Sequence, residues 1–291
     1  MNILIATNLN IRRNEVRAIA RALNKNHKVT IACMNFDTPY RGMSFTADNA
    51  PVGTEQYMYK DVLGGRYGAS LLSESKEAIL NPESEGGEFD QIVVHEFYGT
   101  PADSVSIMLS DVMKAHTPDI VVCGISNGIN MGSDIYASSH AGMAMMATIM
   151  GVPAVMLSTE RMQGGHTVES LQNLCKFVSK NIEKFAKMNL PEHTFLNISF
   201  PNRERYDDIA GVKYTNMAKM NLRVTYEERK DTRGKPYYWA KLNHRGEVIA
   251  DIDDEVTWFE KGYVTITPIS IDSTDFDLLE KWSKDKDMQV K

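Results

Sequence analysis

The chain has few cysteines, no excess of basic residues and no long apolar run, and each absence excludes a class of protein. Its three cysteines, Cys33, Cys123 and Cys175, show no CxxC spacing, so we expect buried free thiols in a reducing compartment. The formal net charge is -6. We therefore expect neither a nucleic-acid polymer nor a membrane as a partner, because both select clustered Lys and Arg. The apolar run at residues 2–7 is too short for a signal peptide or a spanning helix, so we expect a cytoplasmic protein.

The first strand-to-helix connection also lacks glycine. The stretch from Thr7 to Ile11 contains none, so the GxGxxG fingerprint that cradles a dinucleotide pyrophosphate is missing. A dinucleotide-dependent oxidoreductase, which would start from the same strand and helix, is therefore disfavoured.

Apolar runs alternate with helical patterns over most of the chain. Runs at residues 3–7 and 29–33 flank a helical pattern at 14–23, which predicts a βαβ unit with parallel strands. Further strands are predicted at 92–94, 119–123, 154–157, 195–200 and 264–269, and further helices at 100–113, 138–150, 167–187 and 276–282. The signal is weak between residues 35 and 92, with one helical patch at 71–80. Strands bounded by helices indicate an α/β fold, with a mostly parallel sheet covered on both faces.

The pattern changes after Pro201 to short β segments joined by turns. They lie at residues 212–214, 222–226 and 237–242, and the turn lies at 231–236. We expect residues 1–209, together with 263–291, to form the core, and residues 210–262 to form a β-hairpin appendage. Isolated hairpins are marginally stable, so we expect this one to pack on another subunit.

A glycine-rich loop follows the predicted strand at 119–123. Gly124, Gly128 and Gly132 recur every fourth residue, which allows sharp turns and a close approach of the backbone to a ligand. The loop also carries three polar side chains: Ser126, Asn127 and Asn130. Ligands bind at the carboxyl ends of parallel strands, so this loop is a candidate binding site. The two asparagines can equally serve to hold a tight turn.

Ser138 and Ser139 open the next predicted helix and are followed by His140. A helix N-terminus presents unpaired N–H groups and a positive dipole, so an anion can dock there without a metal. His140 is then a candidate donor to that anion, or a general acid or base. It can equally be a polar residue of the first turn, and both serines are useful as helix caps whether or not anything binds.

Several stretches together resemble the SurE (survival protein E) family of metal-dependent nucleotidases and phosphatases. They follow the family's order and lie at residues 2–23, 99–103, 118–132, 151–154, 197–201, 233–234, 238–239 and 262–268. The resemblance implies a Rossmann-like core, a divalent metal and hydrolysis of nucleoside monophosphates. It also implies dimers or tetramers that exchange carboxy-terminal hairpins.

The resemblance further implies a metal held by two adjacent aspartates, a serine and an asparagine of the glycine loop. The residues of this chain at those positions are Asn8, Leu9, Pro39 and Ser126. A hard cation requires oxygen ligands with negative charge, so we expect no metal cofactor. A rebuilt site for Mg²⁺ or Mn²⁺ remains an alternative, with ligands drawn from Asn8, Asn10, Asp37 and Asp134.

Our first hypothesis is a protein on a nucleotidase scaffold that binds a phosphorylated or other anionic small molecule. Its chemistry is metal-independent, with His140 as the candidate catalytic group, or it has no phosphatase activity. The predicted binding residues are Asn8, Asn10, Ser126, Asn127, Gly128, Asn130, Ser138 and Ser139. The alternatives are an active metal-dependent phosphomonoesterase with a rearranged metal site, and a non-catalytic oligomeric scaffold or sensor.

Overall fold

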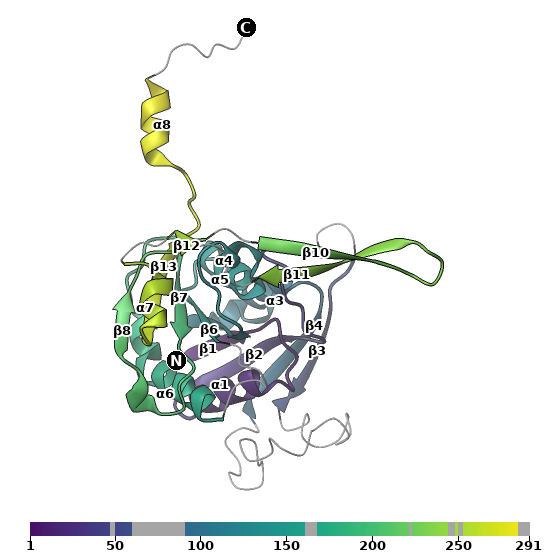
Figure 1. Ribbon diagram of the computed structural model, residues 1–291. Coiled ribbons are helices and arrows are strands. Elements are labelled where there is room, and N and C mark those ends of the chain that lie inside the picture. Colours follow the sequence, from purple (N-terminus) through teal and green to yellow (C-terminus); the bar gives the residue numbers. More distant parts are fainter. Residues whose placement is uncertain are drawn as a thin grey trace.

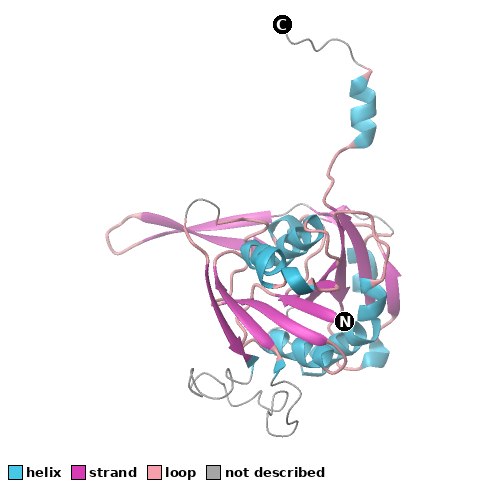
Figure 2. Ribbon diagram, turned by 180° about the vertical axis from the view of Figure 1, so that it is seen from behind, coloured by secondary structure: helices cyan, strands magenta, loops and turns pink. Residues whose placement is uncertain are grey.

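The computed structural model describes residues 1–46, 50–59, 91–160, 168–220, 223–243, 248–249 and 253–284. Its centre is a nine-stranded sheet in the order β3-β4-β2-β1-β5-β6-β7-β13-β8 (Figure 1). Helices cover both faces of this sheet, and a long hairpin and a terminal helix extend away from it (Figure 2).

Six neighbouring strands in the middle of the sheet are parallel. They are β4 (Val93–Tyr98), β2 (Lys28–Met34), β1 (Asn2–Ala6), β5 (Ile120–Asn127), β6 (Ala154–Thr159) and β7 (Thr194–Phe200). From β1 the chain builds outward through β2 and β4, and it then begins the other half of the sheet at β5. The strand order thus reverses between β1 and β5, and the carboxyl ends of strands at such a reversal are where open α/β sheets generally place a ligand crevice.

The edges of the sheet are mixed. The outer strands are β3 (Gly53–Met58), antiparallel to β4; β13 (Tyr263–Ser270), antiparallel to β7; and β8 (Gly211–Tyr214), parallel to β13. The sequence predicted no strand at β3, because its residues are polar and largely exposed, so its extended form depends on pairing with β4. The predicted helical patch at 71–80 lies outside the described residues.

Two layers of helices cover the sheet. The helices α1 (Asn14–Asn24) and α6 (Val168–Ala186) cover one face, and α3 (Pro101–Ile107) and α5 (Ser139–Ile149) cover the other. Alternation along β1 serves both layers, because Ile3 and Ile5 join the first apolar cluster and Leu4 joins the second. The predicted α/β, Rossmann-like fold with a mostly parallel sheet is confirmed.

The helix α3 starts where the sequence predicts. Thr100 caps it, accepting a hydrogen bond from the Asp103 N–H at 3.2 Å, and the Asp103 carboxylate accepts one from the Thr100 N–H at 2.9 Å. The predicted end near Met113 is less regular: after Ile107 the chain continues as a π-helical turn, η5 (Met108–Val112), and a 3₁₀ turn, η6 (Lys114–His116).

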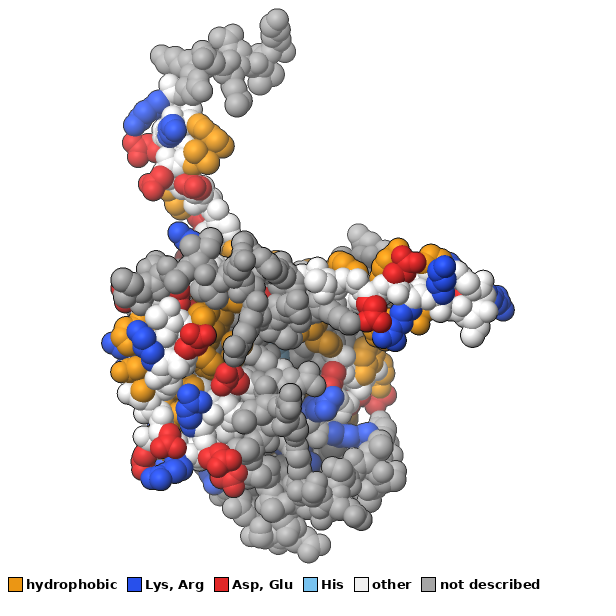
Figure 3. Space-filling model, viewed as in Figure 1, with side chains coloured by type: hydrophobic (Ala, Val, Ile, Leu, Met, Phe, Trp, Pro, Cys, Tyr) orange, Lys and Arg blue, Asp and Glu red, His pale blue; other side chains and the backbone are white. Residues whose placement is uncertain are grey.

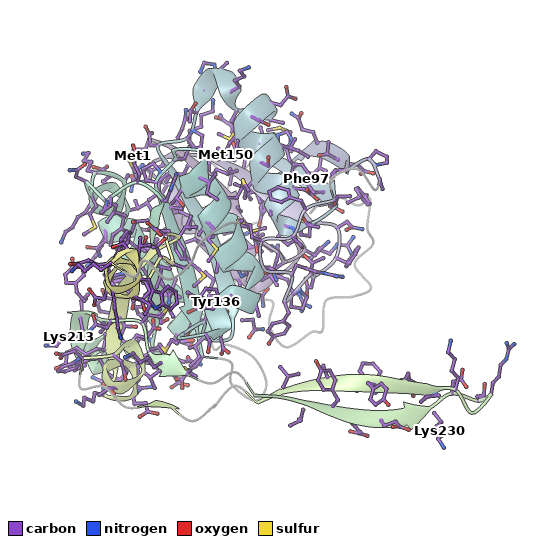
Figure 4. All side chains as sticks on the ribbon, turned by 90° about the horizontal axis from the view of Figure 1, so that it is seen from above. Met1, Phe97, Tyr136, Met150, Lys213 and Lys230 are labelled. Carbon is purple, nitrogen blue, oxygen red and sulfur yellow. The ribbon has the colours of Figure 1, made fainter. Side chains whose placement is uncertain are left out.

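The predicted hairpin is present as β10 (Arg223–Lys230) and β11 (Pro236–Asn243). Figure 4 shows it extending from the body, with Lys230 near its tip. The protruding part is narrower than the predicted appendage of residues 210–262. The strand β8 belongs to the main sheet, and α7 (Glu255–Glu260) packs against β13. Three short elements connect these parts. The 3₁₀ turn η7 (Tyr206–Asp208) precedes β8, and the paired strands β9 (Lys219–Met220) and β12 (Val248–Ile249) precede and follow the hairpin in the sequence.

The carboxy-terminal helix α8 (Phe276–Ser283) is found at the predicted place but projects from the body instead of returning to it (Figure 1). None of its side chains is buried, and Phe276, Leu279 and Trp282 are exposed, as Figure 3 shows for its apolar side. Of the helices that are described, none has the length and apolar character needed to cross a bilayer.

Candidate functional site

The crevice between β1 and β5 brings together residues that are far apart in the sequence. The connection after β1 begins at Thr7, the loop after β2 contains Thr38, and a short helix, α4 (Asp134–Ala137), leads from the glycine loop into α5. Hydrogen bonds join these segments, as described below. The crevice is therefore built from loops that the parallel strands place at one edge of the sheet.

Residues 38–43, here called segment 38–43, lie directly on the first turns of α5. The Ser139 hydroxyl donates to the Thr38 carbonyl at 2.7 Å and accepts from the Arg41 N–H at 3.0 Å. The Gly42 N–H donates to the carbonyl of Ala137 at 3.1 Å. A Cβ atom on Gly142 would lie 2.1 Å from the Gly42 carbonyl oxygen, so only glycine permits this contact. Segment 38–43 is thus tied to α5 through its backbone and through the Ser139 hydroxyl.

Asn8 is tied to the same segment. Its Nδ2 donates to the Thr38 carbonyl at 3.1 Å, and its own carbonyl accepts from the Thr38 N–H at 2.9 Å. The side chain is buried, and its Oδ1 has no hydrogen-bond partner in the described part of the chain. Asn10 is likewise engaged, because its Nδ2 donates to the Asn35 carbonyl at 2.8 Å. Asn8 and Asn10, two of the four asparagines predicted to bind a ligand, therefore hold the loops around Thr38 and Asn35 in place.

His140 is buried beneath the crevice, with 2% of its surface exposed. Its Nε2 lies 3.3 Å from the hydroxyl of Thr7, and the two side chains share a hydrogen bond whose donor depends on the histidine tautomer. Burial lowers the pKa of His140 to about 3, because the charged ring would lose its hydration. The ring is therefore neutral near pH 7, where it lacks the imidazolium proton that a general acid would give and is a weak base.

The other predicted residues of the helix start behave as caps. Ser138 accepts a hydrogen bond from the Ala141 N–H at 3.3 Å, as the sequence predicts for an N-cap. The N–H groups of Ser139 and His140 follow it in the first turn, where amides have no acceptor within their own helix. The exposed side chain of Arg41 lies on the segment that covers this turn. The helix start thus combines backbone donors with a nearby positive charge.

The glycine loop forms its own set of hydrogen bonds. The Gly128 N–H donates to the carbonyl of Thr159 at 3.1 Å, and the Asn130 N–H donates to the Ser158 hydroxyl at 3.4 Å. The Asn130 side chain donates to the Gly128 carbonyl at 3.4 Å, in accord with a turn-holding role. Ser126 is half-buried and Asn127 is exposed, so these two side chains are the groups of the loop open to a ligand.

Two of the positions at which the resemblance implies metal ligands, Leu9 and Pro39, have no side-chain oxygen. The Leu9 side chain, 9% exposed, packs in the apolar cluster beneath α1, and Pro39 offers no side-chain oxygen. Within the rebuilt set, Asp37 accepts from the Asn10 N–H at 2.9 Å and from Arg13 Nε at 2.8 Å. This ion pair raises the pKa of Arg13. Among the residues that the structure describes, no group of three or more His, Cys, Asp or Glu side chains is placed to hold a metal.

Three residues of the crevice were not predicted from the sequence: Thr7, Thr38 and Arg41. Thr38 acts mainly through its backbone carbonyl, which leaves no trace in a residue pattern. Thr7 was read only as the end of a strand, although a hydroxyl at the end of a parallel strand is a usable signal. Arg41 directly precedes Gly42, which has φ +54 in the structure. In the sequence, a cation beside a glycine is the signal that could have pointed to Arg41.

The fold defines the class of protein: a Rossmann-like α/β protein with a candidate ligand site at the reversal of strand order. The family model described as "Survival protein SurE" matches residues 3–224. This chain therefore belongs to the SurE family.

Individual relatives agree with the family match. A protein of Caldanaerobacter subterraneus subsp. tengcongensis named "5'-nucleotidase SurE" is 34% identical over 196 residues, covering 67% of this chain and 74% of that protein. One from Gloeothece citriformis with the same name is 29% identical over 288 residues, covering 94% and 92%. The crystal structure of the SurE protein from Aquifex aeolicus superposes with a TM-score of 0.69 at 23% identity, covering 98% of this chain and all of that one, which supports the fold.

Proposed function

We propose that the crevice binds a phosphorylated or other anionic small molecule at the start of α5, without the divalent metal of the family. The observation that carries this proposal is the first turn of α5. Ser138 caps this turn, and Ser139 fixes the segment bearing Arg41 on it. A helix dipole and an arginine together favour an anion.

The residues at the family's metal positions do not fit a divalent cation. Leu9 is apolar and packed, Pro39 has no donor, and Asn8 and Ser126 offer neutral oxygens. The Asn8 side chain also needs its N–H, because that group donates to the Thr38 carbonyl; an aspartate there would place a carboxylate oxygen against another oxygen. We therefore derive no chemical step through a metal.

We further propose that His140 links the end of β1 to the start of α5 instead of exchanging protons with a ligand. Its burial, its contact with Thr7 and its lowered pKa support this role. The ligand-facing groups are then the side chains of Arg41, Ser126 and Asn127 and the first amides of α5.

The test is ligand binding with and without chelator. A ligand that binds only the folded state stabilises it, by about 2.7 kcal/mol at a concentration of 100 times Kd. We expect inorganic phosphate and AMP each to raise Tm, and for each ligand we expect the same rise in EDTA as in manganese. Arg41→Gln should weaken this shift, whereas Arg205→Gln, at an exposed arginine elsewhere, should not. The proposal fails if no anion raises Tm, or if the shift requires the metal.

A second candidate function is a metal-dependent phosphomonoesterase, and the observation in its favour is the name "5'-nucleotidase SurE" of the relatives. It predicts release of phosphate from a nucleoside monophosphate when manganese or magnesium is added. Assays of the unchanged chain decide this directly. The variant Asn8→Asp/Leu9→Asp asks whether acidic residues restore such activity, and its Tm must be measured in parallel, because Leu9 is buried.

We also propose that the chain assembles with further copies of itself through the β10–β11 hairpin. The support is its protrusion from the body and its exposed aromatic residues, which are taken up in the Discussion.

A further inference from the structure

The carboxylate of Glu255, the first residue of α7, is fully buried below the glycine loop. Its Oε1 accepts hydrogen bonds from the N–H of Gly132 at 2.7 Å and of Ala218 at 3.3 Å. Its Oε2 accepts from the hydroxyl of Thr267 at 3.0 Å and from Nδ2 of Asn197 at 3.1 Å. One side chain therefore joins four segments that are separate in the sequence.

Two of these contacts fix the end of the glycine loop. Gly132 is held directly, and Asn197 Nδ2 also donates to the carbonyl of Asn130 at 2.8 Å. The loop is thus held at two positions, on one side by Glu255 and on the other by a residue that Glu255 orients. The half-buried Ser126 and the exposed Asn127 pair with Ser158 and Thr159 of β6 and lead directly into the part of the loop that these anchors hold.

A third contact ties the loop to the segment that leads into the hairpin. Gly132 has φ +53, and a Cβ atom there would lie 2.8 Å from the Ala218 carbonyl oxygen and from Cγ of Met220. The Ser133 hydroxyl donates to the Met220 carbonyl. Because Glu255 accepts from both Gly132 and Ala218, the loop and the root of the hairpin share one acceptor.

No lysine or arginine is found paired with this carboxylate among the described residues, so its surroundings supply only neutral donors. Burial raises the pKa of Glu255, and the four hydrogen bonds oppose that rise. Burying a carboxylate without a countercharge carries a large desolvation penalty. An apolar residue would fill the same space without that penalty, so packing alone does not account for Glu255. What the carboxylate adds is directional acceptors, which set the positions of the groups that donate to it.

We infer that Glu255 is a positioning residue for the ligand site: it holds the glycine loop in its binding shape and ties that shape to the root of the hairpin. This inference rests on the proposed anion-binding function. It assigns to α7, which contacts no ligand, a part in the affinity of the crevice.

The test compares Glu255→Gln with Glu260→Gln, an exposed glutamate at the other end of the same helix. Glutamine can keep one acceptor but turns an N–H toward Thr267 or toward a backbone donor, so the loop loses a charge-assisted bond. The Kd for AMP, measured by titration calorimetry in EDTA, should rise about tenfold in Glu255→Gln and stay unchanged in Glu260→Gln.

A purely structural residue would lower Tm and leave Kd unchanged, so the two measurements separate the roles. If Glu255→Gln does not fold, Thr267→Val is the second variant. It removes one of the donors to the Glu255 carboxylate, and we expect it to weaken AMP binding about threefold. Wild-type affinity in a folded variant of either kind would overturn the inference while leaving the anion site intact. Lack of AMP and phosphate binding by the unchanged chain would overturn the proposed function and this inference together.

Discussion

The start of α5 and the β10–β11 hairpin differ in how far the rest of the chain covers them. At the start of α5, segment 38–43 approaches so closely that Gly42 and Gly142 meet without side chains between them. Along the hairpin, Tyr226 and Tyr238 lie exposed, as do Tyr237 and Trp239. Figure 3 shows hydrophobic side chains on the surface of the hairpin. Because side chains alternate along a strand, each face of the hairpin carries aromatic groups. The first region is covered by the chain itself, whereas the second leaves exposed the surface through which we propose assembly.

The largest expected effect comes from Gly142→Ala. The added Cβ would meet the Gly42 carbonyl at 2.1 Å, so either α5 or segment 38–43 must move. We expect a loss of about 3 kcal/mol in the free energy of unfolding, measured by urea denaturation.

The matched control is Gly234→Ala in the hairpin turn, where φ is +81 and no atom lies within 4 Å. Only backbone strain acts there, at a cost of about 1 kcal/mol. Equal losses in the two variants would show that the α5 contact is looser than described.

The next effect is the pH dependence contributed by His140. Its ordinary pKa of 6.5 applies in the unfolded chain, and burial lowers it to about 3 in the folded protein. Between these values the unfolded chain binds the proton and the folded protein does not. Stability therefore falls as pH drops from about 6.5 toward 3, by at most about 1.4 kcal/mol per pH unit.

Replacing the ring separates this contribution from those of other groups. The variant His140→Gln should flatten the dependence of unfolding free energy on pH, and His116→Gln, at an exposed histidine, should not. An unchanged slope in His140→Gln would mean that the ring titrates in the folded protein, and it would reopen its role as a catalytic acid or base.

The smallest effect on stability is expected in the hairpin. Tyr238→Ser/Trp239→Ser changes two exposed side chains, so the unfolding free energy of a single chain should change by no more than about 0.5 kcal/mol. Assembly, measured by size-exclusion chromatography with light scattering, should decrease strongly. If the unchanged chain is a monomer at every concentration, the hairpin is no interface and the comparison between the two regions fails.

Much of the sheet could be predicted from local sequence because apolar runs such as that of β5 are buried on both faces. Capping also gave reliable helix starts, as at Thr100 and Ser138. The strand β3 was missed because an exposed edge strand carries little apolar pattern.

The candidate site was harder to predict because its contacts span long distances in the chain. Ser139 and Thr38 are 101 positions apart, and their bond uses a backbone carbonyl that no residue type reveals. His140 is buried, and its Nε2 meets the hydroxyl of Thr7, which lies 133 positions away, so a polar residue at a helix start could not show this environment. The hairpin was predictable, by contrast, because alternation and a turn suffice to define it.

The contact between Gly42 and Gly142 has one more consequence. It involves backbone atoms alone, so no change of side-chain rotamer can widen or narrow it. Segment 38–43 is therefore held by the chain itself, and the anion that we propose to bind there would not bear the entropy of fixing that loop. Segment 38–43, which carries Arg41, is in this sense preorganised. Preorganisation lowers the cost of binding, and it would thus favour even a small ligand that makes few contacts.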